Sequence, residues 1–159
     1  MVEVFGIPII AGSKFENSAK LNHVASVMAE LLDQDGDGCA DDPNVLRNIL
    51  TKSKGLRKSV VLPNAEVTKA GMVVLKKIQK MGYYPGQNLR FGEIKPKCSG
   101  LHDTAKCVDA SIEEMYHFIT KFGHSIAYPK IFGTNWHAPS TLTKAMDIAR
   151  YFFGINFPY

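Results

Sequence analysis

Apolar residues recur at steps of three and four along much of the chain. The clearest case runs from Leu21 to Leu32 and follows Asn17 and Ser18, either of which can cap a helix. The same spacing returns later, and it predicts helices over 18–32, 43–50, 64–78, 111–123 and 141–153.

Two short apolar runs instead predict strands. Val2 to Ile10 ends at Gly12, and Ser59 to Leu62 ends at a Pro-Asn pair. Residues 81–107 are rich in Gly and Pro, which predicts a long irregular connection with room for a short strand near Leu89 to Ile94. We therefore expect one globular domain over 1–159, mainly α (α+β with a small sheet), with about five helices and an EF-hand-like helix–loop–helix near the N-terminus.

Composition is that of an ordinary soluble domain, with 45% hydrophobic and 21% charged residues in 159. No apolar run approaches the roughly 20 residues that span a bilayer, and the first residues do not resemble a signal peptide, so we expect a soluble or processed chain. The net charge of +4 comes from scattered basic residues. It argues only weakly for an anionic partner, gives no indication of nucleic acid, and leaves the partner unknown.

Three cysteines allow at most one disulfide within the chain. Cys98 and Cys107 bracket a polar stretch that reads as a loop, so we expect them to be bonded and Cys39 to be the thiol left over. Unpaired thiols in a reducing compartment remain the alternative.

An acidic loop separates the first two predicted helices. Asp33, Asp35 and Asp37 alternate and are followed by Gly38, as in the first half of an EF-hand loop. There, positions one, three and five supply oxygens and the glycine makes the sharp turn. The spacing predicts a calcium ligand set.

The second half of this loop departs from the EF-hand pattern. Cys39 offers its backbone carbonyl at position seven and Asp41 its carboxylate at position nine, but Asn44 stands where an EF-hand has a bidentate Glu. The loop resembles extracellular calcium loops of the dockerin type, in which Asp42 or Asn44 would complete a looser shell. We expect a structural Ca²⁺; the alternative is a solvated acidic turn that needs no ion.

A second candidate site lies on the predicted helix 111–123. Glu113-Glu114-Met115-Tyr116-His117 resembles the zincin motif His-Glu-x-x-His with its first histidine replaced. In that interpretation Glu113 and His117 bind Zn²⁺ or another transition metal, Glu114 is the catalytic base, and His124 or His137 is a third ligand.

Other interpretations of this helix stay open. Glu113 and His117 have the spacing of an ordinary surface pair on a helix. Ser111 with Glu114 matches a capping box at the start of this helix, which is predicted to end near Gly123. A hydrogen-bonded helix face without metal, or another polar site without metal, would use the same residues.

Five segments together resemble a poorly characterised family of secreted proteins in marine invertebrates and bacteria. They are Val4 to Ile10, Lys20 to Ala25, Leu31 to Asp42, Asp109 to His117 and Ala145 to Arg150. The family's recurring features are an Asp-x-Asp-x-Asp-Gly loop and a Glu-Glu-x-x-His helix. The resemblance implies export to a secreted, extracellular location, but it brings no established activity.

These observations favour an extracellular calcium-binding module with a structural or binding role. The alternative is a metal-dependent, zincin-like hydrolase that uses the Glu-Glu-x-x-His helix.

Overall fold

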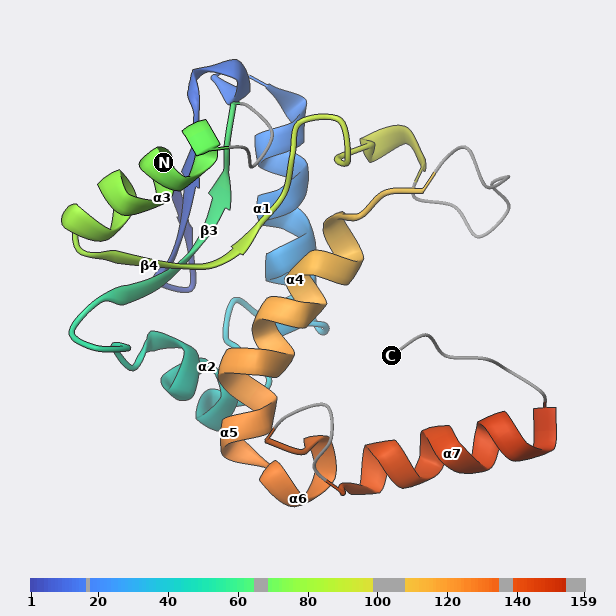
Figure 1. Ribbon diagram of the computed structural model, residues 1–159. Helices are drawn as coiled ribbons and strands as arrows, with labels where there is room; N and C mark the ends of the chain where they lie inside the picture. The colour runs from blue at the N-terminus through green and yellow to red at the C-terminus, as the bar shows by residue number, and fades with distance from the viewer. Residues whose placement is uncertain (17, 65–68, 99–107, 135–138, 154–159) are drawn as a thin grey trace.

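A four-stranded mixed sheet forms the centre of the molecule in the computed structural model, which describes residues 1–16, 18–64, 69–98, 108–134 and 139–153 (Figure 1). The strand order is β1-β2-β3-β4; β1 and β2 are antiparallel, whereas β2, β3 and β4 are parallel. The strands are β1 (Val2–Val4), β2 (Ile7–Ala11), β3 (Arg57–Leu62) and β4 (Tyr83–Asn88).

The helices of the described residues are α1 (Ala19–Leu32), α2 (Pro43–Leu50), α3 (Lys69–Lys80), α4 (Ser111–Ile119), α5 (Ser125–Ala127), α6 (Pro129–Phe132) and α7 (Thr141–Phe153), with short turns η1 (Ser13–Phe15), η2 (Pro96–Cys98) and the π-helical η3 (Thr120–His124). Of these, α2 and α7 have the bounds that the sequence predicts. Within the described residues, no helix is long and apolar enough to cross a membrane.

The expected class, a mainly helical domain with a small sheet, is wrong, because the chain is α+β. The error lies in β4, whose Tyr-Tyr-Pro-Gly-Gln-Asn sequence was interpreted as irregular. Pro85 pairs with Ser59 and Gln87 pairs with Val60, so Gly86 is an extra residue in the ladder. An edge strand tolerates proline at such a bulge.

Both faces of the sheet are covered. On one face, Ile9 and Val60 join a cluster with Met28 of α1 and Met115 of α4, all with 0% exposure. On the other face lies α3, which packs against β4 (Figure 1). Its Ile78 is buried outside that main cluster, as is Val61 of β3. The molecule therefore has three layers, with α3 on one face of the sheet and α1 with α4 on the other.

The helix that was expected to end near Gly123 continues through it. α4 passes into the π-helical η3 and then α5, which ends at Ala127. A Cβ on Gly123 would lie 2.5 Å from Val45 Cγ1 and 3.2 Å from Ile49 Cδ1. The absence of a side chain at Gly123 thus lets α2 and η3 approach closely, and the glycine serves packing rather than helix termination.

Candidate functional site

The acidic loop begins where α1 ends, and Asp33 organises it. One Asp33 oxygen, Oδ1, accepts hydrogen bonds from the backbone N–H groups of Gly36 (2.9 Å) and Asp37 (3.2 Å). The other, Oδ2, accepts from the N–H of Gly38 (3.0 Å). Gly36 and Gly38 have φ of 72° and 86°, which only glycine adopts readily. The loop therefore wraps around the Asp33 carboxylate.

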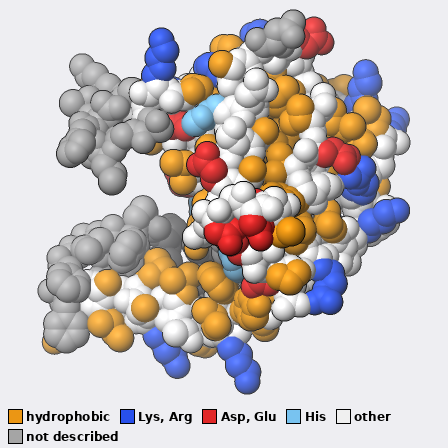
Figure 2. Space-filling model, turned by 180° about the vertical axis from the view of Figure 1, so that it is seen from behind, with side chains coloured by type: hydrophobic (Ala, Val, Ile, Leu, Met, Phe, Trp, Pro, Cys, Tyr) orange, Lys and Arg blue, Asp and Glu red, His pale blue; other side chains and the backbone are white. Residues whose placement is uncertain are grey.

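This turn brings three carboxylates together. Asp33, Asp35 and Asp37 each offer an oxygen, and these oxygens lie within 4.8 Å of one another. At such separations each pair of charges repels by about 1 kcal/mol in bulk water, and by more beside a protein surface. The carbonyl end of the α1 dipole adds negative potential. The group in Figure 2 (red, centre) thus forms a site of strongly negative potential made of hard oxygen ligands.

The other predicted calcium ligands make further contacts in and beside the loop. Asp41 Oδ2 accepts a hydrogen bond from Gln34 N (2.9 Å), which closes the loop. Asn44 lies in the first turn of α2, where its Oδ1 accepts from Arg47 Nη2. Cys39 donates its N–H to Asp37 Oδ1 (2.7 Å), and its thiol is exposed and free.

The far end of the loop is tied to the rest of the fold by Asp42. Its Oδ1 caps α2 by accepting from Asn44 N and Val45 N, and its Oδ2 accepts from Tyr128 Oη (2.7 Å). Burial alone would raise the pKa of Asp42, but the bonds from Tyr128 and the backbone, with the nearby His124, hold that pKa below its usual value. The loop is thereby anchored to the junction of α5 and α6.

Two of the predicted transition-metal residues of α4, Glu113 and His117, lie side by side. Glu113 Oε1 lies 3.6 Å from His117 Nε2, and these side chains are 68% and 42% exposed. In the part of the chain that is described, Asp33, Asp35 and Asp37 form the only group of three or more His, Cys, Asp or Glu side chains placed to hold a metal ion. His137 lies outside the described residues.

Glu114 and His124 have separate surroundings. Glu114 Oε2 accepts a hydrogen bond from Gln87 of β4, and burial raises the pKa of Glu114. His124 stacks on Phe132 with ring centroids 4.6 Å apart, and its Nδ1 is buried without a hydrogen bond. Burial lowers the pKa of His124, although Asp42 opposes this shift. Glu114 thus contacts the sheet, while His124 packs against α6.

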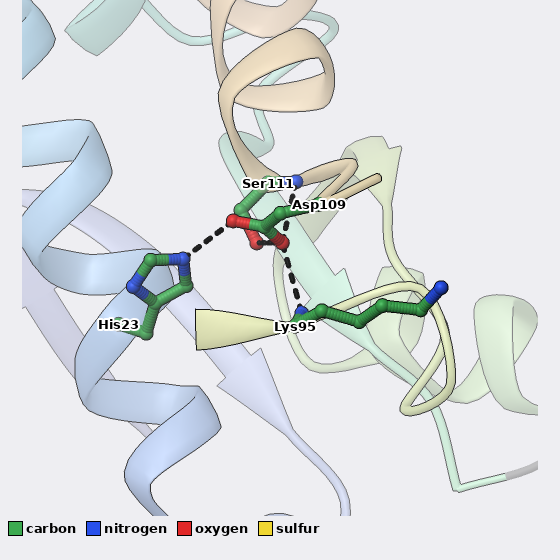
Figure 3. Close-up of polar contacts among 4 residues, drawn as sticks. All are labelled: His23, Lys95, Asp109 and Ser111. Carbon is green, nitrogen blue, oxygen red and sulfur yellow. Dashed lines mark hydrogen bonds and ion pairs between the residues drawn. The ribbon is translucent and has the colours of Figure 1, made fainter. Parts of the chain in front are cut away.

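The structure also contains a polar cluster that the sequence did not reveal (Figure 3). The side chain of His23, in α1, is only 18% exposed, and its Nε2 lies 2.6 Å from Asp109 Oδ2. The other Asp109 oxygen accepts from Lys95 N (2.9 Å), Ser111 N (3.3 Å) and Ser111 Oγ (2.9 Å). Asp109 therefore links α1, the segment after β4 and the start of α4.

Asp109 also replaces the predicted capping box of α4. No side chain caps this helix at Ala110, and Glu114 contacts Gln87 rather than the helix start. Burial would raise the pKa of Asp109, but the bonds from Lys95, His23 and Ser111 outweigh it and lower that pKa. The only sequence signal for this contact was an acidic residue, Asp109, two positions before the first residue of the predicted helix.

Only one cysteine of the predicted disulfide lies within the described residues. Cys98 closes η2, and Cys107 lies outside the described residues. The pairing stays a prediction.

Comparisons of the chain with protein families, with characterised proteins and with solved structures gave no match.

Proposed function

We propose that this chain is an extracellular calcium-binding module in which Asp33, Asp35 and Asp37 hold one structural Ca²⁺. The observation that carries the proposal is the arrangement of the three carboxylates, whose oxygens lie within 4.8 Å of one another. Backbone N–H groups fix Asp33 and Asp37 in place, so binding requires little rearrangement.

The proposed affinity suits an extracellular location. The loop lacks the bidentate Glu that completes a high-affinity EF-hand, and Asn44 in its place contacts Arg47. Loops with fewer charged ligands bind Ca²⁺ with dissociation constants of about 10⁻⁴ to 10⁻³ M, as extracellular modules do.

A structural role follows from what the loop joins. It connects α1, which packs on α4, to α2, which packs on η3 and α5. The hydrogen bond between Asp42 and Tyr128 fixes the end of the loop nearest α2. An ion at the other end would fix the exit from α1, so that both ends of the connection are held.

Thermal unfolding with and without calcium tests the proposal. A ligand at 100 times its Kd stabilises the folded state by about 2.7 kcal/mol. For a domain of this size that is a rise in Tm of about 5 to 10 °C. Elemental analysis of the calcium-saturated protein should give one calcium per chain.

Asp35→Ala removes one carboxylate from the loop, and it should abolish most of the rise in Tm. Glu16→Ala is the matched control, because Glu16 is exposed, acidic and remote in sequence from the loop. The proposal is wrong if calcium leaves the Tm of the wild-type protein unchanged, or if both variants respond like wild type.

A further inference from the structure

The outer face of α3 combines exposed lysines with exposed apolar side chains. Val73, Val74 and Met81 are 67%, 44% and 59% exposed. α3 contains no acidic residue. We call this surface the α3 face; it consists of Val73, Val74, Lys76, Lys77, Lys80 and Met81.

The fold explains why these residues face outward. Ile78 is 5% exposed, and α3 packs on β4. At about 100° per residue, Val73, Lys76 and Lys80 lie on the side of the helix opposite Ile78. Lys77 lies on the flank, and Val74 and Met81 lie closer to Ile78. Figure 1 shows α3 at the outer edge of the molecule, with the sheet behind it.

Two further lysines extend the positive charge beyond the end of α3. Lys52 and Lys54 are exposed in the segment before β3. Arg57, the first residue of β3, donates its N–H to Gly82 O (3.0 Å), directly after α3. The side chain of Arg57 pairs with Glu3 at 2.8 Å, which offsets one charge there. Figure 2 shows basic side chains along this edge of the molecule, at the right of the view.

Folding alone does not account for this face. Lysines in the last turn of a helix interact favourably with its dipole, which explains Lys77 and Lys80. However, the pair Lys76 and Lys80 repel each other across one turn, and exposed Val73 and Met81 contribute nothing to the core. A partner with negative charge beside an apolar layer would attract the lysines and bury the exposed apolar side chains at the same time.

We propose that the α3 face docks on the surface of an anionic lipid bilayer. Val73, Val74 and Met81 would enter the boundary between headgroups and acyl chains. The flexible lysine stems would lie along the apolar layer while their charges reach the phosphates. Nucleic acid is less suited, because the α3 face has neither the arginines nor the aromatic rings that bind phosphates bidentately and stack on bases.

Sedimentation with lipid vesicles in EDTA tests this proposal separately from calcium binding. We expect the wild-type protein to bind vesicles of phosphatidylcholine with 30% phosphatidylglycerol, and to bind pure phosphatidylcholine far more weakly. The triple variant Lys76→Gln, Lys77→Gln, Lys80→Gln should lower the partition coefficient by about tenfold or more. The control Lys14→Gln, Lys130→Gln, Lys144→Gln removes the same charge from exposed positions elsewhere and should have a much smaller effect.

A second variant separates insertion from simple charge attraction. Val73→Ser with Met81→Ser keeps every lysine, and it should remove the part of the binding that survives at 500 mM salt. Equal binding to both vesicle types, or equal losses in the two lysine variants, would overturn the proposal. So would binding to poly-glutamate or RNA at low salt in place of anionic vesicles.

Discussion

Replacing Asp109 with alanine tests whether the cluster in Figure 3 holds the fold together. Four hydrogen bonds end on this carboxylate, whose side chain is 2% exposed. Asp109→Ala leaves the N–H of Lys95 and both donors of Ser111 without their acceptor. Each unsatisfied buried donor costs about 1 to 3 kcal/mol, and water entering the space left by the carboxylate recovers part of this. We expect a total loss of about 3 kcal/mol, a large share of the free energy of unfolding of a small domain.

The measurement is urea-induced unfolding at pH 7, followed by far-UV circular dichroism. Asp109→Asn is the matched control, because its carbonyl oxygen still accepts from Lys95 and Ser111 and its amide can donate to the other tautomer of His23. It should cost only about 1 kcal/mol. His23→Ala should cost about 1 to 2 kcal/mol, and the double variant should cost less than the sum of the single ones by about 1 kcal/mol. A loss below 0.5 kcal/mol for Asp109→Ala, or strictly additive losses, would refute the reasoning.

The same carboxylate predicts how stability depends on acid. The pKa of Asp109 is lower in the folded state than its ordinary value near 3.8. Its ionised form therefore stabilises the fold fully above pH 3.8, and this contribution is lost as the pH falls through the folded-state pKa. The wild-type protein should lose more stability than Asp109→Asn between pH 5 and pH 2. Parallel stability curves for the two proteins over that range would contradict this assignment.

Two further substitutions test how α2 is held. Lys58 is 7% exposed, and its Nζ donates to the carbonyl oxygens of Asn48, Ile49 and Thr51 at the end of α2. Lys58→Met should therefore lower the free energy of unfolding, measured in urea, by about 2 kcal/mol. The control Lys52→Met changes an exposed lysine and should alter this free energy by less than 0.5 kcal/mol. Gly123→Ala places a methyl group 2.5 Å from a side-chain carbon of buried Val45. It should lower the free energy of unfolding by about 1 to 2 kcal/mol, which calorimetry would record as a fall in Tm of about 2 to 8 °C. An unchanged Tm would show that α2 moves aside without cost.

The helices could be predicted well because each carries a regular apolar face and a clear boundary. α2 begins at Pro43 and α7 spans Thr141–Phe153, both as the periodicity indicates. β4 could not be predicted, since its pairing with β3 depends on contacts distant in sequence and its Pro-Gly pair indicates a turn. The acidic loop could be found in the sequence because its three carboxylates stand within five consecutive residues. Asp109 and His23 were missed because eighty-six positions separate two residues that bond directly.

The position of the acidic loop also has a consequence for the order of folding. The loop lies within the long crossover between β2 and β3, whose parallel pairing requires a large loop to close. All the hydrogen bonds that shape the Asp33 turn are made within a few residues, so this turn can form before the strands meet. An ion bound there would fix the exit from α1 early and shorten the search for the β2–β3 register. Calcium would then act chiefly by accelerating folding, with a smaller effect on the rate of unfolding.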